Sequence, residues 1–328
     1  MLTDESQIGA VGMMKRTVSS LFIWFILGMM TCLMAGCALG KGTSKFQVET
    51  EEVRVTIPGM EGEKTFLYLS DLHLILESDQ IAAKDLEEVR SRMAWSSHDG
   101  VTAAESWPGW VECLNGRKAD AILFGADMID FASRANVDCL KEGLKKLEHP
   151  WLYVRADHDL APSYLDGVFE TESIGYQRKI GETLKEDAFA DVMVLEFEDL
   201  IVAGWNNSTA QLTEAGLLQM KSLFKTGKPI ILLTHVPIKP LGDDSLSEAS
   251  KEAWGGRELL WGDGCAYVPN EVTREFLNMI YDDNTPVCEI LCGHLHFSWD
   301  GYVTGKVHQH VFGAAIDRHL GVIRVTGK

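Results

Sequence analysis

The sequence predicts an α/β domain. From about residue 45 onward, short runs rich in β-branched and aromatic residues alternate with stretches of helical periodicity, which is typical of that class. Several runs are apolar throughout, as in strands that are covered on both faces. Acids and histidines directly follow several of these runs. We therefore expect a sheet with a polar site at the edge where its strands end.

The predicted elements follow one another without an internal repeat or a long Pro/Gly/Ser linker, which favours one domain over residues 38–328. Two stretches, 95–116 and 242–264, are rich in glycine and tryptophan and fit no element, so we expect long loops around the site, or elements that the pattern hides. The predicted strands are 53–57, 65–69, 121–124, 151–154, 192–197, 200–203, 230–234, 287–291, 301–304, 308–312 and 322–325, and the predicted helices are 79–93, 136–147, 213–224 and 271–280.

Residues 1–37 predict an export signal and not a part of the fold. A short positive region at Lys15 and Arg16 precedes an apolar run over 18–30, and the tetrapeptide ending at Cys37 resembles the lipobox of bacterial lipoproteins. The run is shorter than the roughly 20 apolar residues of a transmembrane helix. We expect an exported protein that is lipidated at Cys37 and anchored on the extracytoplasmic side of a membrane. Met34, where leucine is usual, leaves an uncleaved anchor or an ordinary signal peptide as alternatives.

The charge of the chain argues against nucleic acid as a partner. Lys and Arg number 30 and Asp and Glu number 48, which gives a net charge of -18 without any basic stretch. An acidic protein that handles phosphate needs cations to supply positive charge. The cysteine spacings match neither a zinc module nor a disulfide scaffold, and we expect Cys288 and Cys292 to be small core residues.

Polar side chains stand at the ends of five predicted strands. Because ligands that follow parallel strands converge at one edge of a sheet, they predict a single site. Carboxylates and imidazoles are the mixture that Mn, Fe or Zn prefers, and two neighbouring cations need a carboxylate between them. The residues are Asp71, His73, Asp127, Asp130, Asp157, His158, Asp159, His235, His294 and His296.

The order of these residues resembles the blocks of the calcineurin-like metallophosphoesterases: Asp-x-His, Gly-Asp-x-x-Asp, Gly-Asn-His-Asp/Glu, a lone His and Gly-His-x-His. The resemblance covers about residues 65–296 and all five blocks. It implies a two-sheet αββα sandwich of the metallo-dependent phosphatase type with two metal ions bridged by Asp127. It further implies Asp71, His73, Asp127 and His296 around the first ion, and Asp127, Asp157, His235 and His294 around the second.

The chemistry of these positions agrees with hydrolysis of phosphate mono- or diesters. Two cations sharing Asp127 would lower the pKa of a bridging water and bind the phosphate oxygens. The resemblance implies that His158 protonates the leaving oxygen, and we expect Asp159 to orient that imidazole and raise its pKa. Asp130 resembles the family's second acid, which more often supports the metal ligands than binds a metal itself.

Three departures from the family pattern leave a second hypothesis open. Ala126 and Ala156 stand where glycine is usual, and Asp157 stands where asparagine is usual. Alanine lacks easy access to positive φ, and the extra acid should tighten cation binding while weakening the activation of water. The alternative is a metal-binding surface lipoprotein with weak or no catalysis, although the His158–Asp159 pair favours an enzyme. His308, like His310, fits no block, and we expect surface or supporting positions for both.

Overall fold

The computed structural model describes residues 46–78, 81, 83, 85–160, 191–208 and 211–327. The predicted export signal, Cys37 and the boundary after it lie outside these residues. Within the described part of the chain, no helix has both the length and the apolar character to cross a membrane. Cys288 and Cys292 are free thiols, one half-buried and one buried, as predicted.

The first sheet has five strands in the order β1-β11-β2-β3-β4. Its strands β2, β3 and β4 are parallel, so their carboxyl ends lie along the same edge. Strand β11 runs antiparallel to β2 and parallel to β1. The bounds are β1 (Glu49–Thr56), β2 (Glu63–Leu69), β3 (Ala121–Phe124), β4 (Trp151–Tyr153) and β11 (His319–Thr326).

The second sheet has six strands in the order β5-β6-β7-β8-β10-β9. Strands β6, β7, β8 and β10 are parallel, whereas the edge strands β5 and β9 are antiparallel to their neighbours. The bounds are β5 (Val192–Glu196), β6 (Ile201–Trp205), β7 (Ile230–Leu233), β8 (Val287–Cys292), β9 (Trp299–Tyr302) and β10 (His308–Val311).

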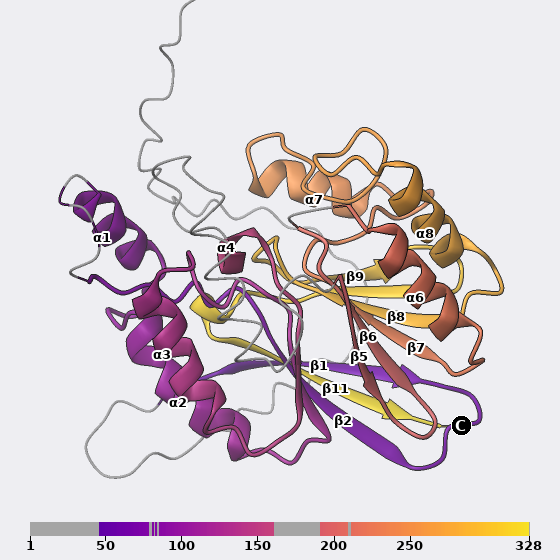
Figure 1. Cartoon of the computed structure of the whole chain (residues 1–328), viewed down its shortest axis with the longest axis horizontal. Coiled ribbons are helices and arrows are strands. Elements are labelled where there is room, and N and C mark those ends of the chain that lie inside the picture. The colour runs from indigo at the N-terminus through magenta and orange to yellow at the C-terminus, as the bar shows by residue number, and fades with distance from the viewer. Residues whose placement is uncertain are drawn as a thin grey trace, which may run out of the picture. The chain divides into compact units, whose positions relative to one another are not determined.

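Helices cover the outer faces of the two sheets (Figure 1). One core cluster joins inward side chains of both sheets, such as Phe66 of β2 and Ile231 of β7. A second packs α2 (Ala103–Asn115) and α3 (Arg134–Leu144) on the first sheet, and a third packs α6 (Glu214–Phe224) and α8 (Glu271–Tyr281) on the second. The predicted αββα sandwich is therefore confirmed.

The predicted strands and helices are present, with ends shifted by a few residues, but the two unassigned stretches contain helices that the prediction missed. Helix α1 (Leu86–Trp95) begins later than the predicted helix at 79, and α4 (Asp157–Leu160) is a single turn. Most of 95–116 is α2, whose Trp107 and Trp110 are buried in the core. The expectation of a long loop there is wrong, and the alternative of an element that the pattern hides is confirmed. The second stretch contains α7 (Ser245–Ala253), and a short 3-10 helix, Ala315–Asp317, precedes β11.

Candidate metal centre

The predicted site residues follow β2, β3, β4, β7 and β8, whose carboxyl ends face the same region of the domain. The loops carry positive φ at non-glycine residues, at Asp71 (57°), Asp127 (51°) and His294 (71°). Left-handed backbone costs an L-residue about 1 kcal/mol or more and persists where the surroundings enforce it. Such strain at adjacent ligand positions is typical of functional loops.

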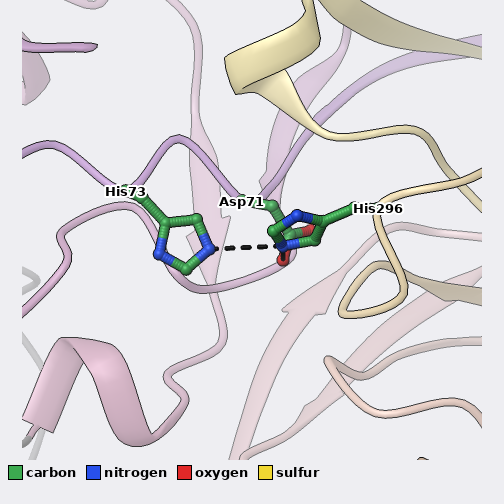
Figure 2. A group of neighbouring side chains, drawn as sticks. All are labelled: Asp71, His73 and His296. Atoms are coloured by element: carbon green, nitrogen blue, oxygen red, sulfur yellow. Dashed lines mark hydrogen bonds and ion pairs between the residues drawn. The ribbon is translucent and has the colours of Figure 1, made fainter. Parts of the chain in front are cut away.

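Asp71, His73 and His296 form the first group of converging ligand atoms (Figure 2). The Nε2 atoms of the two histidines are 3.3 Å apart, and His296 Nε2 lies 3.3 Å from Asp71 Oδ1. His73 Nδ1 donates to Asp130 at 3.1 Å, which directs its Nε2 toward the group. The three side chains are therefore placed to hold one cation.

Asp127 and His235 belong to a second group of converging ligand atoms, and His294 lies beside His235. His235 Nε2 lies 3.1 Å from Asp127 Oδ2, and His294 Nδ1 lies 3.2 Å from His235 Nε2. The Nδ1–H of His235 donates to the carbonyl oxygen of Gly125 at 2.7 Å, so its Nε2 faces Asp127. Asp71 also lies within reach of the Asp127–His235 pair. The predicted assignment of these residues to two separate ions stays a prediction.

Asp127 lies between the two sets, and its surroundings show whether a cation fits there. Its Oδ2 is 3.8 Å from His73 Nε2, on the side of the first group. Its Oδ1 is buried and has no hydrogen-bond partner among the described residues. An ionised buried oxygen without a donor is costly unless a cation neutralises it. The residues therefore fit a metal centre that includes Asp127.

The pKa values follow from this crowding of acids and imidazoles. Burial opposes ionisation of Asp127, but the neighbouring His235 and His158 hold its pKa well below the usual value. Burial also opposes protonation of His235, yet Asp127 outweighs it and raises the His235 pKa to about 10. Burial and His235 lower the pKa of His294 to about 3. A cation that binds here would displace the proton of His235 and take over its charge.

Asp157 stands apart from both groups. Its side chain is exposed, and its Oδ1 accepts a hydrogen bond from the hydroxyl of Ser208. None of the converging groups found among the described residues includes it. Its predicted role as a ligand stays a prediction, and in this structure it acts on the site through its charge.

His158 lies beside the two groups and is held by Asp130. Its Nδ1–H donates to the carbonyl oxygen of Asp130 at 3.0 Å, and its Nε2 lies 4.0 Å from Asp127 Oδ2. Burial opposes protonation, but Asp127, Asp130 and Asp157 outweigh it and raise the pKa of His158 to about 9. The imidazole thus favours its protonated form at neutral pH.

Asp159 has a different role from the predicted one. Its buried carboxylate accepts hydrogen bonds from the N–H groups of Asp127, Met128 and Ala156 and from the hydroxyl of Tyr153. The contact to His158 Nδ1 comes from Asp130. The prediction that Asp159 orients His158 is therefore wrong, because its oxygens are used to fix the backbone of the Asp127 loop.

Sequence reasoning missed several residues that support the centre. Arg92 of α1 donates twice to the Asp130 carboxylate. Asn207 accepts from the N–H groups of His235 and Val236 and donates to the carbonyl oxygen of Val236. Two tryptophan rings, Trp95 and Trp254, lie beside His296. A polar strand end after β6 could have indicated Asn207, whereas no local signal marks Arg92.

The sandwich and its cluster of carboxylates and imidazoles define a fold of the metallo-dependent phosphatase type. The sequence profile described as calcineurin-like phosphoesterase matches residues 64–298. The match extends over more than half of the chain, which belongs to this family. No curated protein sequence matches it.

Solved structures with related folds include phosphatases of distant sequence. A dimetal phosphatase from Danio rerio shares 11% identity, with 77% of this chain and 88% of that chain covered and a TM-score of 0.46. A purple acid phosphatase from yellow lupin seeds shares 9% identity, with 80% and 45% covered and a TM-score of 0.47. A 5'-nucleotidase from Candida albicans shares 12%, with 77% and 46% covered and a TM-score of 0.41.

Proposed function

We propose that this protein hydrolyses phosphate mono- or diesters with a dinuclear metal centre. The observation that carries the proposal is the buried Oδ1 of Asp127, which has no hydrogen-bond partner among the described residues and lies between two sets of ligand atoms. Bound cations, Mn, Fe or Zn, would supply activated water and positive charge for the phosphate oxygens. Asp71, His73 and His296 would hold one ion and His235 and His294 the other, with Asp127 shared and Asp157 adding charge or a ligand.

His158 is the residue that we expect to protonate the leaving oxygen. Asp127, Asp130 and Asp157 raise its pKa, its Nδ1–H is anchored on the Asp130 carbonyl, and its Nε2 lies 4.0 Å from Asp127 Oδ2. Arg92 holds the Asp130 carboxylate, and the Asp130 carbonyl holds His158. The proton donor is therefore fixed relative to Asp127 before substrate binds.

The test is hydrolysis of bis-p-nitrophenyl phosphate and p-nitrophenyl phosphate by the full chain after metal removal and reloading with Mn, Fe or Zn. We expect no turnover by the metal-free protein and recovery with at least one metal. Two bound ions without turnover under any of these conditions would favour the alternative of a metal-binding protein without catalysis. Turnover of carboxylic esters alone would redirect the proposal to another hydrolase.

We also propose that the protein is exported and anchored through lipid on Cys37. The positive region, the apolar run and the tetrapeptide before Cys37 support this proposal. Labelling of cells with a fatty-acid analogue should mark the wild-type chain in the membrane fraction. Cys37→Ser should be unlabelled, whereas Cys32→Ser, a change inside the signal, should be labelled as the wild type is. Equal labelling of Cys37→Ser would exclude lipidation at this residue.

A further inference from the structure

A second cluster of metal-ligand side chains lies on the second sheet and shares no residue with the Asp127 centre. It consists of Glu289 of β8 and His308 and His310 of β10, and each offers one ligand atom within 4.8 Å of the others. We propose that these three residues form a separate zinc site.

The strand register builds this cluster. His308 is the register partner of Glu289 across the parallel β8–β10 pair, so the two side chains leave the same face of the sheet. His310 is two residues further along β10 and leaves that face as well. Asp300 of β9 is the partner of His310 on the other side of β10. Three neighbouring strands therefore direct two imidazoles and two carboxylates toward one place.

The distances fit coordination by zinc. His308 Nδ1 lies 3.1 Å and His310 Nε2 lies 3.3 Å from the same Oε1 of Glu289. Ligand atoms that hold a tetrahedral zinc at about 2.1 Å are separated by about 3.4 Å. His308 Nε2 lies 3.7 Å from Asp300 Oδ2. At that distance Asp300 adds negative charge beside the cluster without a hydrogen bond to His308.

An ion pair between Glu289 and His308 accounts for only part of the arrangement. The Glu289 side chain is only 5% exposed, so its charge needs a cationic partner. One protonated imidazole would suffice for that. His310 adds a second ring nitrogen at the same oxygen, at 3.3 Å. Two imidazoles that converge on one buried carboxylate oxygen form a ligand set that suits a divalent metal ion.

The donor atoms of the cluster favour zinc, and solvent exposure makes the cluster accessible to the ion. Two imidazoles and one carboxylate suit zinc and disfavour calcium or magnesium, which prefer oxygen ligands. The side chains of His308 and His310 are 22% and 15% exposed, so solvent reaches the cluster. A bound zinc would tie β8 to β10 next to the loop that carries His294.

The zinc content of the full chain, purified in detergent and equilibrated with buffered free zinc, tests this proposal. We expect the double variant His308→Asn, His310→Asn to bind about one zinc ion fewer per chain than the wild type. Asp127→Asn, His235→Asn should retain the ion that the first variant loses, which separates this proposal from that of the dimetal centre. His98→Asn is the matched control, because His98 faces Asp99 at 3.6 Å and belongs to none of the ligand clusters found among the described residues. The zinc content of this variant should equal that of the wild type.

Equal zinc content in the wild type and the His308, His310 double variant would overturn the proposal. Glu289→Gln keeps the size of the side chain and should show the same loss, which covers the case in which the double variant fails to fold. A second experiment uses the wild-type protein alone and so does not depend on the folding of a variant. Crystals grown with zinc should give an anomalous peak between Glu289, His308 and His310, and the absence of that peak would also overturn the proposal.

Discussion

The two clusters of histidines and carboxylates in this domain differ in how the backbone builds them. The Asp127 centre lies on loops, and Asp71, Asp127 and His294 all have positive φ. The Glu289 cluster lies on regular strands, in register across β8 and β10. The loop-built centre therefore depends on strained turns, whereas the strand-built cluster depends only on which strands are neighbours.

The strained loops need a scaffold that the strands do not need. Asp159 binds the N–H groups of the Asp127 loop, and Asn207 binds those of the His235 loop. The Asp159 carboxylate thereby holds a left-handed turn that the backbone would otherwise leave, whereas Asn207 fixes a loop in which His235 and Val236 have no positive φ. The difference shows that the residues around the Asp127 centre contribute to the stability of the fold as well as to the chemistry of the site. The following substitutions separate these two contributions.

The largest effect is expected for Asp127→Asn, which removes the shared anion of the loop-built centre. We expect kcat/KM for bis-p-nitrophenyl phosphate to fall by about 1,000-fold or more, since a neutral amide cannot offset two cations. Steady-state kinetics with saturating metal measures the loss.

Asp99→Asn is the matched control for this substitution. Asp99 has φ 52°, close to the 51° of Asp127, and its side chain is 91% exposed. The same chemical change in the same backbone conformation should leave turnover near that of the wild type. A comparable loss in both variants would mean that strained backbone, and not the shared ligand, explains the effect.

His158→Asn should have the next largest effect and should depend on the leaving group. Asparagine can donate to the Asp130 carbonyl but cannot deliver a proton, so hydrolysis of phenyl phosphate should slow by about 100-fold or more. p-Nitrophenolate leaves without protonation, and its ester should lose less than about 10-fold. Equal losses for the two esters would contradict the role of His158 as proton donor.

Asp159→Asn tests the scaffold of the loop-built centre. An amide offers one acceptor and adds N–H groups that face other N–H donors, so the free energy of unfolding should fall by about 2–4 kcal/mol. Tyr153→Phe removes a single donor to the same carboxylate and should cost about 1 kcal/mol. Urea denaturation measures both changes. Unchanged stability with an altered pH profile of turnover would restore the predicted orienting role.

The sequence predicted the loop-built centre because its residues stand beside the strands that place them. Asp71 and His73 are two residues apart, as are His294 and His296, so strand ends and spacing were sufficient. The partner of His158 could not be predicted this way. Asp159 is adjacent in sequence, but the one-turn helix α4 directs its carboxylate to the Asp127 loop.

The strand-built cluster and helix α2 escaped prediction for other reasons. The register that joins Glu289 to His308 follows from the strand order β8-β10-β9, which no local pattern encodes. Helix α2 has a capping box in which Thr102 and Glu105 bond each other's backbone, a signal that sequence reasoning could have used. Pro108, within the helix, obscured that signal.

The smallest effect separates strain from packing at the two alanines that replace glycine in the family pattern. Ala126 has φ 76°, whereas Ala156 is not among the described residues with positive φ, and both are fully buried. Replacing alanine with glycine removes a buried methyl group and increases the conformational entropy of the unfolded chain. Each change lowers the free energy of unfolding by roughly 1 kcal/mol, and Ala156→Gly should show both losses. Ala126→Gly also relieves a left-handed alanine, a gain of about 1 kcal/mol. We therefore expect Ala126→Gly to destabilise the protein by about 1 kcal/mol less than Ala156→Gly in urea denaturation, and equal losses would show that the Asp127 turn carries no strain at Ala126.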